Sequence, residues 1–235
     1  MAGEALPHYP GKELEAMSSA VNYHRWIIDE FAPWLSGDVA EVGAGIGTMS
    51  ELILARPVRR LRAFEPSSNM FPRLAAALGG EPRAEAINDF FGPRQAGAGF
   101  DAILYINVLE HVDDDRAELA HAWRALKPGG RLLVFVPALQ WLYSDFDRQV
   151  GHLRRYRRGA LARAAREAGF EVEKARYFDL TGVLPWYVHF VLLGRSMGGG
   201  SVTLYDRLAV PLTRFVERLV PPPFGKNVLL VARKP

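Results

Sequence analysis

The most informative part of the sequence is Ala40-Glu41-Val42-Gly43-Ala44-Gly45-Ile46-Gly47-Thr48, which follows a short apolar run and opens a segment of helical spacing. Its three glycines allow a tight turn and let the backbone approach a ligand, since no Cβ stands in the way. The dinucleotide-binding fingerprint is GxGxxG, but here the third glycine comes one residue early, at Gly47, and Thr48 occupies the expected position. The stretch therefore predicts a strand, a turn and a helix, with a turn that either holds a ligand or only connects the two elements.

The chain around this turn alternates between strand-like and helix-like segments. Short apolar runs lie at residues 39–42, 61–64, 84–87, 102–106, 131–136, 170–178 and 227–233. Helical spacing marks residues 49–54, 70–78, 116–126 and 160–168. Strands that alternate with helices at this pitch indicate parallel βαβ units, so the sequence predicts an α/β sheet covered on both faces. The run 132–136 contains no polar residue, as expected of a strand buried on both sides.

The N-terminal part of the chain is predicted to be a helical cap over the sheet or over a pocket. One helical face before the first strand gathers the apolar residues Leu14, Met17, Val21 and Ile28. Proline is poorly tolerated inside a helix, so this helix should end near Pro33, and the cap as a whole should span residues 1–36.

An apolar insertion is predicted between the last two strands, at residues 179–226. It is too long for a plain loop in a compact domain and should contain its own helices. Its second half carries an apolar stripe formed by Leu204, Leu208, Leu212, Phe215 and Leu219. Pro211 falls inside this stripe and should kink or split the helix. The apolar run 183–193 is shorter than the roughly 20 residues that cross a bilayer, so it is not predicted to be a transmembrane segment.

Composition narrows the class of protein. Of 235 residues, 49% are hydrophobic and 23% are charged, which is typical of a globular protein, and we expect residues 1–235 to form a single domain. The absence of cysteine excludes disulfides, thiolate zinc sites and cysteine nucleophiles. A net charge of +3 does not by itself indicate nucleic acid. No basic region followed by an apolar core opens the chain, so we expect a cytoplasmic protein, with membrane association as an alternative.

Five motifs follow one another in an order that resembles the class I S-adenosylmethionine (SAM) methyltransferases. The first is the turn with the pattern ExGxGxG, from Glu41 to Gly47. The other four are Glu65-Pro66, Asn88-Asp89-Phe90, Asn107-Val108-Leu109-Glu110-His111 and Leu126-Lys127-Pro128-Gly129-Gly130. The resemblance implies an α/β fold with a Rossmann-like, doubly wound sheet of seven strands and an antiparallel last strand. The N-terminal cap helix and a helical insertion before the last strand would complete it.

The same resemblance implies where SAM and its product S-adenosylhomocysteine would bind. The glycine-rich turn would back the amino-acid portion of the cofactor, with Glu41 orienting its ammonium group. Glu65 would accept hydrogen bonds from both ribose hydroxyls. Asp89 would meet the adenine amino group, and Phe90 would line the ring. The complete set of expected cofactor residues is Glu41, Gly43, Ala44, Gly45, Gly47, Glu65, Pro66, Asn88, Asp89, Phe90, Asn107 and Val108.

The segment after the fifth strand carries the candidates for catalysis. Its spacing, F-D-x-x-x-G-H-x-R-R-Y, resembles a bacterial subgroup of these methyltransferases. His152 can titrate near neutral pH and could take a proton from the methyl acceptor, unless it only bonds the loop backbone. His111 is the second catalytic candidate and Tyr156 the third.

The same segment supplies most of the residues expected to bind the methyl acceptor, which are Arg154, Arg155, Tyr143 and Trp186. The two arginines could hold a phosphate or carboxylate, or they could pair with Asp145 and Asp147 to fix the loop. The sequence shows no spacing of histidines and carboxylates typical of metal ligands, so no metal is expected.

The expected function is methyl transfer from SAM to a small acceptor that is hydrophobic or lipid-linked, as in secondary-metabolite, glycan or lipid biosynthesis. The apolar residues 183–220 favour such an acceptor, as a lid, a homodimer interface or a membrane-surface helix, although they could also be ordinary core packing. The alternatives are a non-catalytic SAM-binding partner subunit and, against the glycine spacing, an NAD-linked oxidoreductase. No nucleic-acid partner is expected, because the basic cluster at residues 154–158 is compact.

Overall fold

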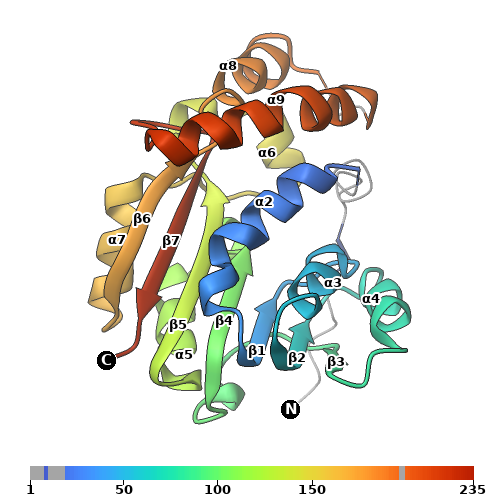
Figure 1. Ribbon diagram of the computed structural model, residues 1–235, viewed down its shortest axis with the longest axis vertical. Coiled ribbons are helices and arrows are strands. Elements are labelled where there is room, and N and C mark those ends of the chain that lie inside the picture. The colour runs from blue at the N-terminus through green and yellow to red at the C-terminus, as the bar shows by residue number, and fades with distance from the viewer. Residues whose placement is uncertain (1–7, 10–18, 196–198) are drawn as a thin grey trace.

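A single mixed sheet organises the computed structural model, which describes residues 8–9, 19–195 and 199–235 (Figure 1). Its strands run in the order β3-β2-β1-β4-β5-β7-β6. Their bounds are β1 (Gly37–Val42), β2 (Val58–Phe64), β3 (Ala84–Ile87), β4 (Phe100–Ile106), β5 (Leu126–Pro137), β6 (Glu171–Phe178) and β7 (Asn227–Arg233). The pairs among β1 to β5 are parallel, whereas β7 is antiparallel to both β5 and β6. The predicted doubly wound sheet of seven strands with an antiparallel last strand is confirmed.

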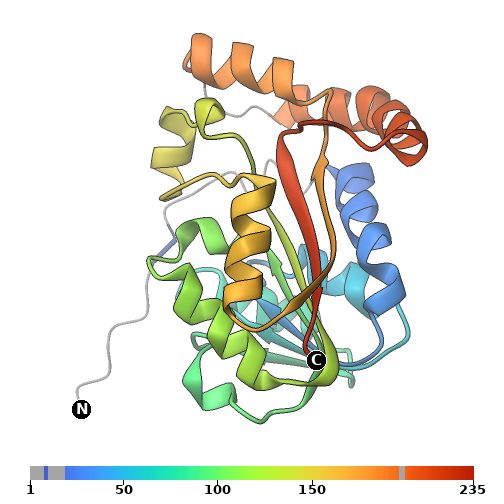
Figure 2. The same ribbon diagram turned by 90° about the vertical axis from the view of Figure 1, so that its left-hand side faces the viewer.

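Helices cover both faces of the sheet, as Figure 2 shows. One face packs against α2 (Val21–Phe31), α3 (Thr48–Leu54) and α4 (Phe71–Leu78). The opposite face packs against α5 (Asp115–Ala125) and α7 (Arg158–Glu167). Successive residues of β5 alternate between the two cores, with Leu133 and Phe135 on the α2 side and Leu132 and Val134 on the other. A strand with a core on each face must be apolar at every position, which explains the run predicted from the sequence.

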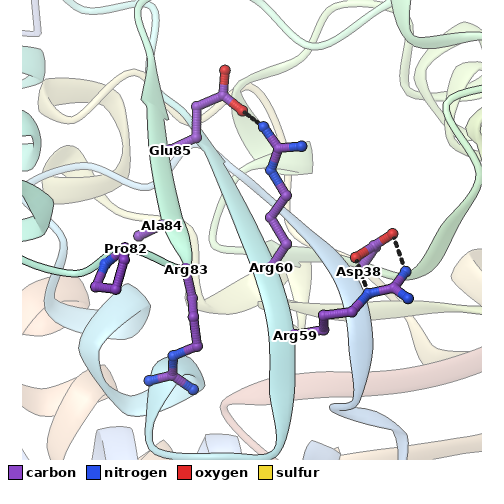
Figure 3. Close-up of a pocket in the computed structure, with 7 residues that line it drawn as sticks. All are labelled: Asp38, Arg59, Arg60, Pro82, Arg83, Ala84 and Glu85. Atoms are coloured by element: carbon purple, nitrogen blue, oxygen red, sulfur yellow. Dashed lines mark hydrogen bonds and ion pairs between the residues drawn. The ribbon is translucent and has the colours of Figure 1, made fainter.

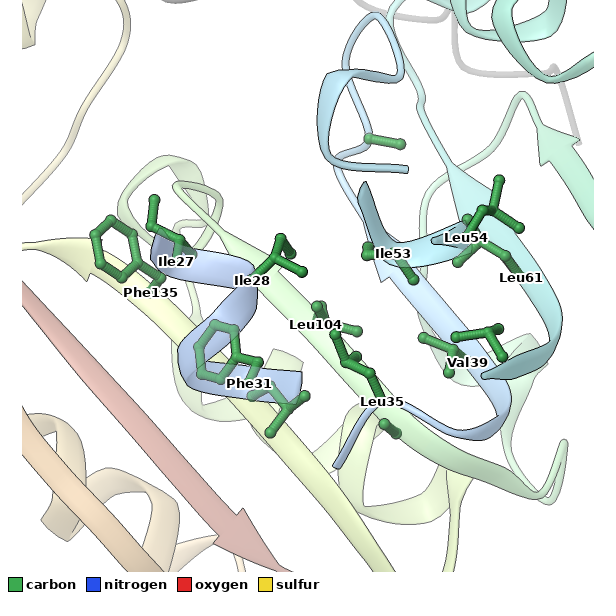
Figure 4. Close-up of a cluster of buried hydrophobic side chains, with 14 of the residues drawn as sticks. Ile27, Ile28, Phe31, Leu35, Val39, Ile53, Leu54, Leu61, Leu104 and Phe135 are labelled. Atoms are coloured by element: carbon green, nitrogen blue, oxygen red, sulfur yellow. The ribbon is translucent and has the colours of Figure 1, made fainter. Parts of the chain in front are cut away.

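The helix α2 fixes the first core against the middle of the sheet. Ile27, Ile28 and Phe31 pack beside Leu104 of β4 and Phe135 of β5 (Figure 4), and all five side chains are fully or almost fully buried. Their close packing anchors the helix over β4, whose carboxyl end carries the fourth motif, and over the neighbouring β5.

The N-terminal prediction is correct in part. The helix gives way to a 3₁₀ turn at Ala32–Trp34, so the predicted end near Pro33 is confirmed, whereas Leu14 and Met17 lie outside the described residues. Val21 and Ile28 both lie in α2, seven residues apart and so on one side of the helix, but Val21 is 46% exposed whereas Ile28 is fully buried. Val21 opens the helix, where Tyr23 instead turns toward the core.

The connection from β5 to α7 is partly helical. It contains a 3₁₀ turn, η4 (Gln140–Leu142), and a short helix, α6 (Asp145–Gln149). Helix α6 begins with a capping box, in which Ser144 and Asp147 satisfy each other's backbone and side-chain groups. This local cap orders the segment that carries the catalytic candidates.

The insertion folds into α8 (Val183–Trp186), a π-helical turn η5 (Tyr187–Leu192) and α9 (Gly199–Leu219). It lies beyond the carboxyl ends of the parallel strands (Figure 1). The expectation that Pro211 could split the helix is wrong, because α9 continues through Pro211 over 21 residues. Asp206 and Thr213, on either side of Pro211, are buried and hydrogen-bonded to the rest of the protein, which holds both halves of the helix in place. Among the described helices, none combines the length and the apolar character needed to cross a membrane.

Candidate functional site

The carboxyl ends of β1, β2 and β4 open into a cavity of about 590 Å³. Its walls also include residues of α2, α6, α8 and the start of β7, as well as His8 and Tyr9 from the N-terminal segment. In open α/β sheets, ligands bind outside the carboxyl ends of the strands where the strand order reverses. Here β2 and β4 flank β1 on opposite sides, so the cavity lies at that point of the topology.

The glycine-rich turn forms the floor of this cavity, and its backbone requires glycine. Gly43, Gly45 and Gly47 all have positive φ, at 68°, 58° and 93°. A Cβ on Gly43 would approach Cγ2 of Val108 to 2.6 Å, so the fourth motif packs directly on the turn. The amides of Gly43 and Ala44 both donate to the carbonyl of Phe64, which ties the turn to the end of β2. Gly43, Ala44, Gly45, Asn107 and Val108 line the cavity, whereas Gly47 is buried behind it.

Glu65 lies on the cavity wall with both carboxylate oxygens fixed. Its Oε2 accepts a hydrogen bond from the Gly45 amide at 2.7 Å, and its Oε1 accepts one from the Ser67 amide at 2.8 Å. Asn88 does not line the cavity but donates its side-chain amide to the Glu65 carbonyl at 2.8 Å. The second motif is therefore held in place by the first motif and by the third.

The remaining residues of the third motif divide between the cavity and the surface. Phe90 lines the cavity with 54% of its surface exposed, leaving a ring face open. Asp89 does not line it, because its carboxylate accepts hydrogen bonds from the Phe90 amide and from Arg94. Pro66 is part of the wall, beside Glu65.

Glu41 is a buried carboxyl group on the cavity wall. Burial raises its pKa to about 8, against the hydrogen bond donated by the Ser50 hydroxyl, and the negative charge of Glu65 adds to the rise. Near neutral pH the group is therefore mostly protonated, and a cation placed beside it would favour its ionisation. This suits a ligand that carries an ammonium group.

The segment around α6 brings His152 and His111 together on the cavity wall. Their ring centroids lie 4.7 Å apart, and the rings meet edge to face. The Nδ1 atom of His152 lies 2.8 Å from Asp147 Oδ1, and the Nδ1 atom of His111 lies 3.2 Å from the Gly151 carbonyl oxygen. Burial and the neighbouring His152 lower the pKa of His111 to about 4, so its imidazole is neutral near pH 7. The expectation that His152 bonds only the loop backbone is wrong, since its partner is a carboxylate.

Two of the expected acceptor-binding residues lie on the wall. Arg155 is almost fully buried and forms a two-pronged ion pair with Asp147, with contacts of 2.9 and 3.0 Å. Its guanidinium also covers the ring of Trp186 at 4.7 Å from the ring centre. Arg155 thus follows the alternative in which an arginine pairs with Asp147 to fix the loop, and Trp186 forms an aromatic part of the wall.

Three other expected site residues are not on the cavity wall. The hydroxyl of Tyr156 bonds the Leu109 carbonyl and Asp115, and that of Tyr143 donates to the His152 carbonyl. Arg154 bonds the Asp113 carbonyl and pairs with Asp115 rather than Asp145. The polar groups of these three side chains bond to other protein groups and not to the cavity. They therefore connect the loop to neighbouring segments.

Several cavity residues were not predicted from the sequence, namely Tyr9, Tyr23, His24, Phe146, Lys226 and Asn227. The position of Lys226 and Asn227 could have been predicted from the direction of the last strand. Because β7 runs antiparallel, its first residues lie at the same edge of the sheet as the carboxyl ends of the other strands. Tyr23 reaches the same place from α2 and donates its hydroxyl to Asn227 at 2.9 Å. No local motif marks these contacts between distant segments.

A second hollow lies at the opposite ends of the strands, where β1, β2 and β3 begin (Figure 3). Its arginines are already paired, Arg59 with Asp38, Arg60 with Glu85, and Arg83 with Glu81. These exposed pairs leave little uncompensated charge for a ligand. The cavity at the carboxyl ends is the stronger candidate for the functional site.

Comparison with known sequences identifies the family. A model described as a methyltransferase domain matches residues 20–175. The ubiquinone biosynthesis O-methyltransferase of Xylella fastidiosa (strain 9a5c) is 35% identical over 134 residues, covering 54% of this chain and 52% of that protein. The malonyl-[acyl-carrier protein] O-methyltransferase of Hahella chejuensis is 30% identical over 107 residues, covering 45% and 38%. The chain spans about half the length of the first of these relatives, or less for the second.

Solved structures agree on the fold. A methyltransferase solved in complex with the Trm112 activator of Haloferax volcanii has a TM-score of 0.64 at 18% identity, covering 95% of this chain and 93% of that one. Phosphoethanolamine N-methyltransferase 2 of Haemonchus contortus, solved with SAM, has a TM-score of 0.60 at 17% identity, covering 91% and 52%. Because the methyltransferase-domain model covers residues 20–175, the NAD-linked alternative is set aside and SAM is the cofactor. The matched domain, the sheet and the glycine-rich cavity together show that this chain belongs to the class I SAM-dependent methyltransferases.

Proposed function

We propose that this methyltransferase acts at the surface of an anionic membrane, on an acceptor that is hydrophobic or lipid-linked. The observation that carries the proposal is the orientation of α9, whose apolar stripe faces outward. The second candidate is a SAM-binding subunit without catalysis, and incubation with methyl-labelled SAM distinguishes it from an active enzyme.

The roles of the cofactor residues follow from the family resemblance, and the position of most of them on the cavity wall supports these roles. Glu41 would hold the ammonium group, the turn from Gly43 to Gly47 would back the amino-acid portion, and Glu65 would bind the ribose hydroxyls. The exposed ring of Phe90 would line the adenine, with Asn88 and Asp89 holding the surrounding loop. Pro66, Asn107 and Val108 would complete the walls. The bound cofactor supplies a methyl group on a sulfonium, ready for in-line displacement.

What the chain itself must supply is alignment, exclusion of water and a route for the acceptor's proton. Alignment alone can contribute about 7–11 kcal/mol to the lowering of a barrier. His152 and His111 are the proposed catalytic residues, because both imidazoles lie on the cavity wall. Tyr156 is better placed to position the loop, since its hydroxyl is bonded to Leu109 and Asp115.

If Glu41 ionises when SAM binds, binding should release a proton to the solution. If SAM brings its ammonium beside this group, binding at pH 7 should release close to one proton, because burial holds the pKa at about 8 before binding. Affinity should therefore rise about tenfold per pH unit up to pH 8 and then level off. Calorimetry in two buffers of different ionisation enthalpy measures the proton release. Glu41→Gln should abolish the difference between buffers, whereas equal release in wild type and variant would contradict the assignment.

The inward side of α9 carries three buried polar residues beside the apolar Val210, which packs in the core. Asp206 accepts hydrogen bonds from the Asn22 and Tyr23 amides, Thr213 bonds Thr181, and Glu217 accepts one from the Leu180 amide, all three being buried. The outward side carries the apolar stripe, each member at least 61% exposed: Leu204, Leu208, Leu212, Phe215 and Leu219. A helix that only covered its own domain would bury its apolar stripe instead of exposing it. The stripe therefore needs an external apolar environment.

The insertion also links this surface to the cavity. Leu184, Leu192 and Leu193 in and beside α8 and η5 are more than half exposed, while Trp186 of the same segment lines the cavity. An acceptor held in a membrane could thus reach the cavity along the insertion. The family model ends before this insertion, at residue 175, so the insertion would be the part that adapts a common domain to a particular acceptor.

Charge favours a membrane over a second copy of the chain as the occupant of this surface. Arg207 and Arg218 of α9 are exposed and border the apolar stripe, Arg195 lies exposed after η5, and the structure gives none of the three an ion pair within the described residues. Apolar side chains flanked by arginines are typical of helices that lie at the surface of anionic bilayers. Two identical surfaces in a homodimer would instead bring these arginines toward one another.

Vesicle binding tests this surface. Leu208→Glu/Leu212→Glu should weaken binding to phosphatidylglycerol-rich vesicles by at least about tenfold, since each buried leucine contributes about 1.5–3 kcal/mol. Ala76→Glu/Ala160→Glu adds the same charge at exposed positions of α4 and α7 and should bind as wild type. Cosedimentation measures the binding. Failure of wild type to bind, with a dimer in size-exclusion chromatography that the leucine variant dissociates, would identify a homodimer interface and overturn the proposal.

A further inference from the structure

A cluster of potential metal ligands lies between the loop after β4 and the loop after α6. Glu110 and His111 belong to η3 (Leu109–His111), and His152 follows α6. One ligand atom from each of these three side chains lies within 4.8 Å of the other two. Two imidazoles and one carboxylate form a ligand set used by catalytic zinc and by non-haem iron sites, which leave coordination positions open.

Both imidazoles are oriented as metal-binding histidines are. In such sites one ring nitrogen binds the ion, and the other donates to a carboxylate or a backbone carbonyl. Here the Nδ1 of His152 contacts Asp147, and the Nδ1 of His111 contacts the Gly151 carbonyl. The Nε2 of His152 then lies 3.8 Å from Glu110 Oε1, too far for a hydrogen bond but suited to an ion between them.

Glu110 is the independent sign of a missing cation. Its side chain is fully buried, and neither carboxylate oxygen has a hydrogen-bond partner within the described part of the chain. An unsatisfied buried carboxylate is costly, and such groups are rare without a function. A divalent cation would supply the missing partner.

We propose that Glu110, His111 and His152 bind one divalent transition-metal ion, such as Zn²⁺, at the wall of the cofactor cavity. The ion would sit where both imidazoles face the cavity, so an open coordination position could take a hydroxyl oxygen of the methyl acceptor. The curated relatives named as O-methyltransferases make an oxygen acceptor a natural choice. Metal–ligand bonds are about 2.1 Å long, so the three side chains would have to move by about 1 Å for their ligand atoms to bind one ion.

The role of such an ion in catalysis depends on the proposed function, methyl transfer from SAM. A hydroxyl bound to a divalent cation loses its proton more readily, because the cation stabilises the oxygen anion. The proton would leave to solvent water. The oxygen lone pair would then form the O–CH₃ bond as the S–CH₃ bond breaks, and the sulfur would keep the electron pair in S-adenosylhomocysteine. His111 and His152 would act as metal ligands in this step.

Direct metal binding tests the site without any reliance on methyl transfer. Untagged full-length protein, freed of metal with a chelator, is titrated with Co²⁺ and followed by visible absorption, and Zn²⁺ affinity is then measured by competition. Wild type should bind one ion per chain. Glu110→Gln and His152→Gln should each weaken binding at least about 100-fold. Circular dichroism checks that each variant is folded.

His121→Gln is the matched control, because His121 faces Glu118 in a histidine–carboxylate pair that lacks a third ligand. This variant should bind Co²⁺ as wild type does. Absence of Co²⁺ binding by wild type would overturn the proposal, as would unchanged affinity in folded Glu110→Gln. Metal binding without methyl transfer to any oxygen acceptor would leave the site standing and would reject only the role of the ion in transfer to oxygen.

Discussion

Asp147→Ala is expected to lower the free energy of unfolding by about 3–5 kcal/mol. Asp147 is fully buried and accepts hydrogen bonds from Arg155, from the Ser144 amide and from His152. The Arg155 guanidinium has only 1% of its side chain exposed, so removal of the carboxylate leaves a buried charge without its partner. Urea unfolding measures the change.

Asp145→Ala is the matched control from the same short helix. Asp145 is 65% exposed and pairs with Arg148, which is itself 60% exposed. Such surface pairs contribute about 0–1 kcal/mol, so stability should barely change. Similar losses in the two variants would contradict the assignment of Asp147 as the centre of the loop.

The pH dependence of this loop has a defined sign. Burial alone would raise the pKa of Asp147, but hydrogen bonds and charges from His152 and Arg155 outweigh it and lower the pKa below 3.8. A lowered pKa in the folded state means that the contribution to stability is present above pH 3.8 and is lost as the pH falls through the folded-state value. Wild type should therefore lose this stability in acid, while Asp147→Ala should not.

Glu65→Ala is expected to weaken S-adenosylhomocysteine binding by about 100-fold or more. Each hydrogen bond to a charged group contributes about 1.5–3 kcal/mol, and the proposed role of Glu65 includes two of them, to the ribose hydroxyls. The variant would also free the Gly45 amide, which Glu65 holds at 2.7 Å, and so loosen the glycine-rich turn. Isothermal titration calorimetry measures the affinity.

Glu51→Ala provides the comparison for Glu65→Ala. Glu51 lies on the exposed side of α3, directly after the glycine-rich turn, and does not line the cavity. Its replacement should leave the affinity within about twofold, since an exposed side chain without ligand contact contributes little. Unchanged affinity in Glu65→Ala would reject the placement of the ribose.

Most of the fold was predictable because its signals are local. The apolar runs of β1, β4 and β5 are buried on both faces, so their sequence does not depend on which helix covers them. The glycine-rich turn was equally clear, since three positive φ angles at alternate positions restrict the residue type. The predicted split of the helix at Pro211 was wrong because the signal there was not local. Tertiary contacts at Asp206 and Thr213 hold α9 together despite the proline.

The cavity was less predictable because distant segments build it. Glu110 and His152 approach each other only after β5 and α6 fold back, and neither segment alone has the spacing of a metal site. The stripe of α9 was visible in the sequence, but its outward orientation was not. That orientation depends on Asp206 meeting the amides of Asn22 and Tyr23 at the other end of the chain.

Transfer of labelled methyl groups tests whether this protein methylates a hydrophobic acceptor. The purified protein is incubated with methyl-labelled SAM and an extract of host metabolites, which is then separated into organic and aqueous fractions. We expect methyl label in the organic fraction with the wild-type protein, and we expect that label to be absent with Glu65→Ala. Label confined to the aqueous fraction would contradict a hydrophobic acceptor, and no transfer in either fraction, despite cofactor binding, would favour a non-catalytic subunit.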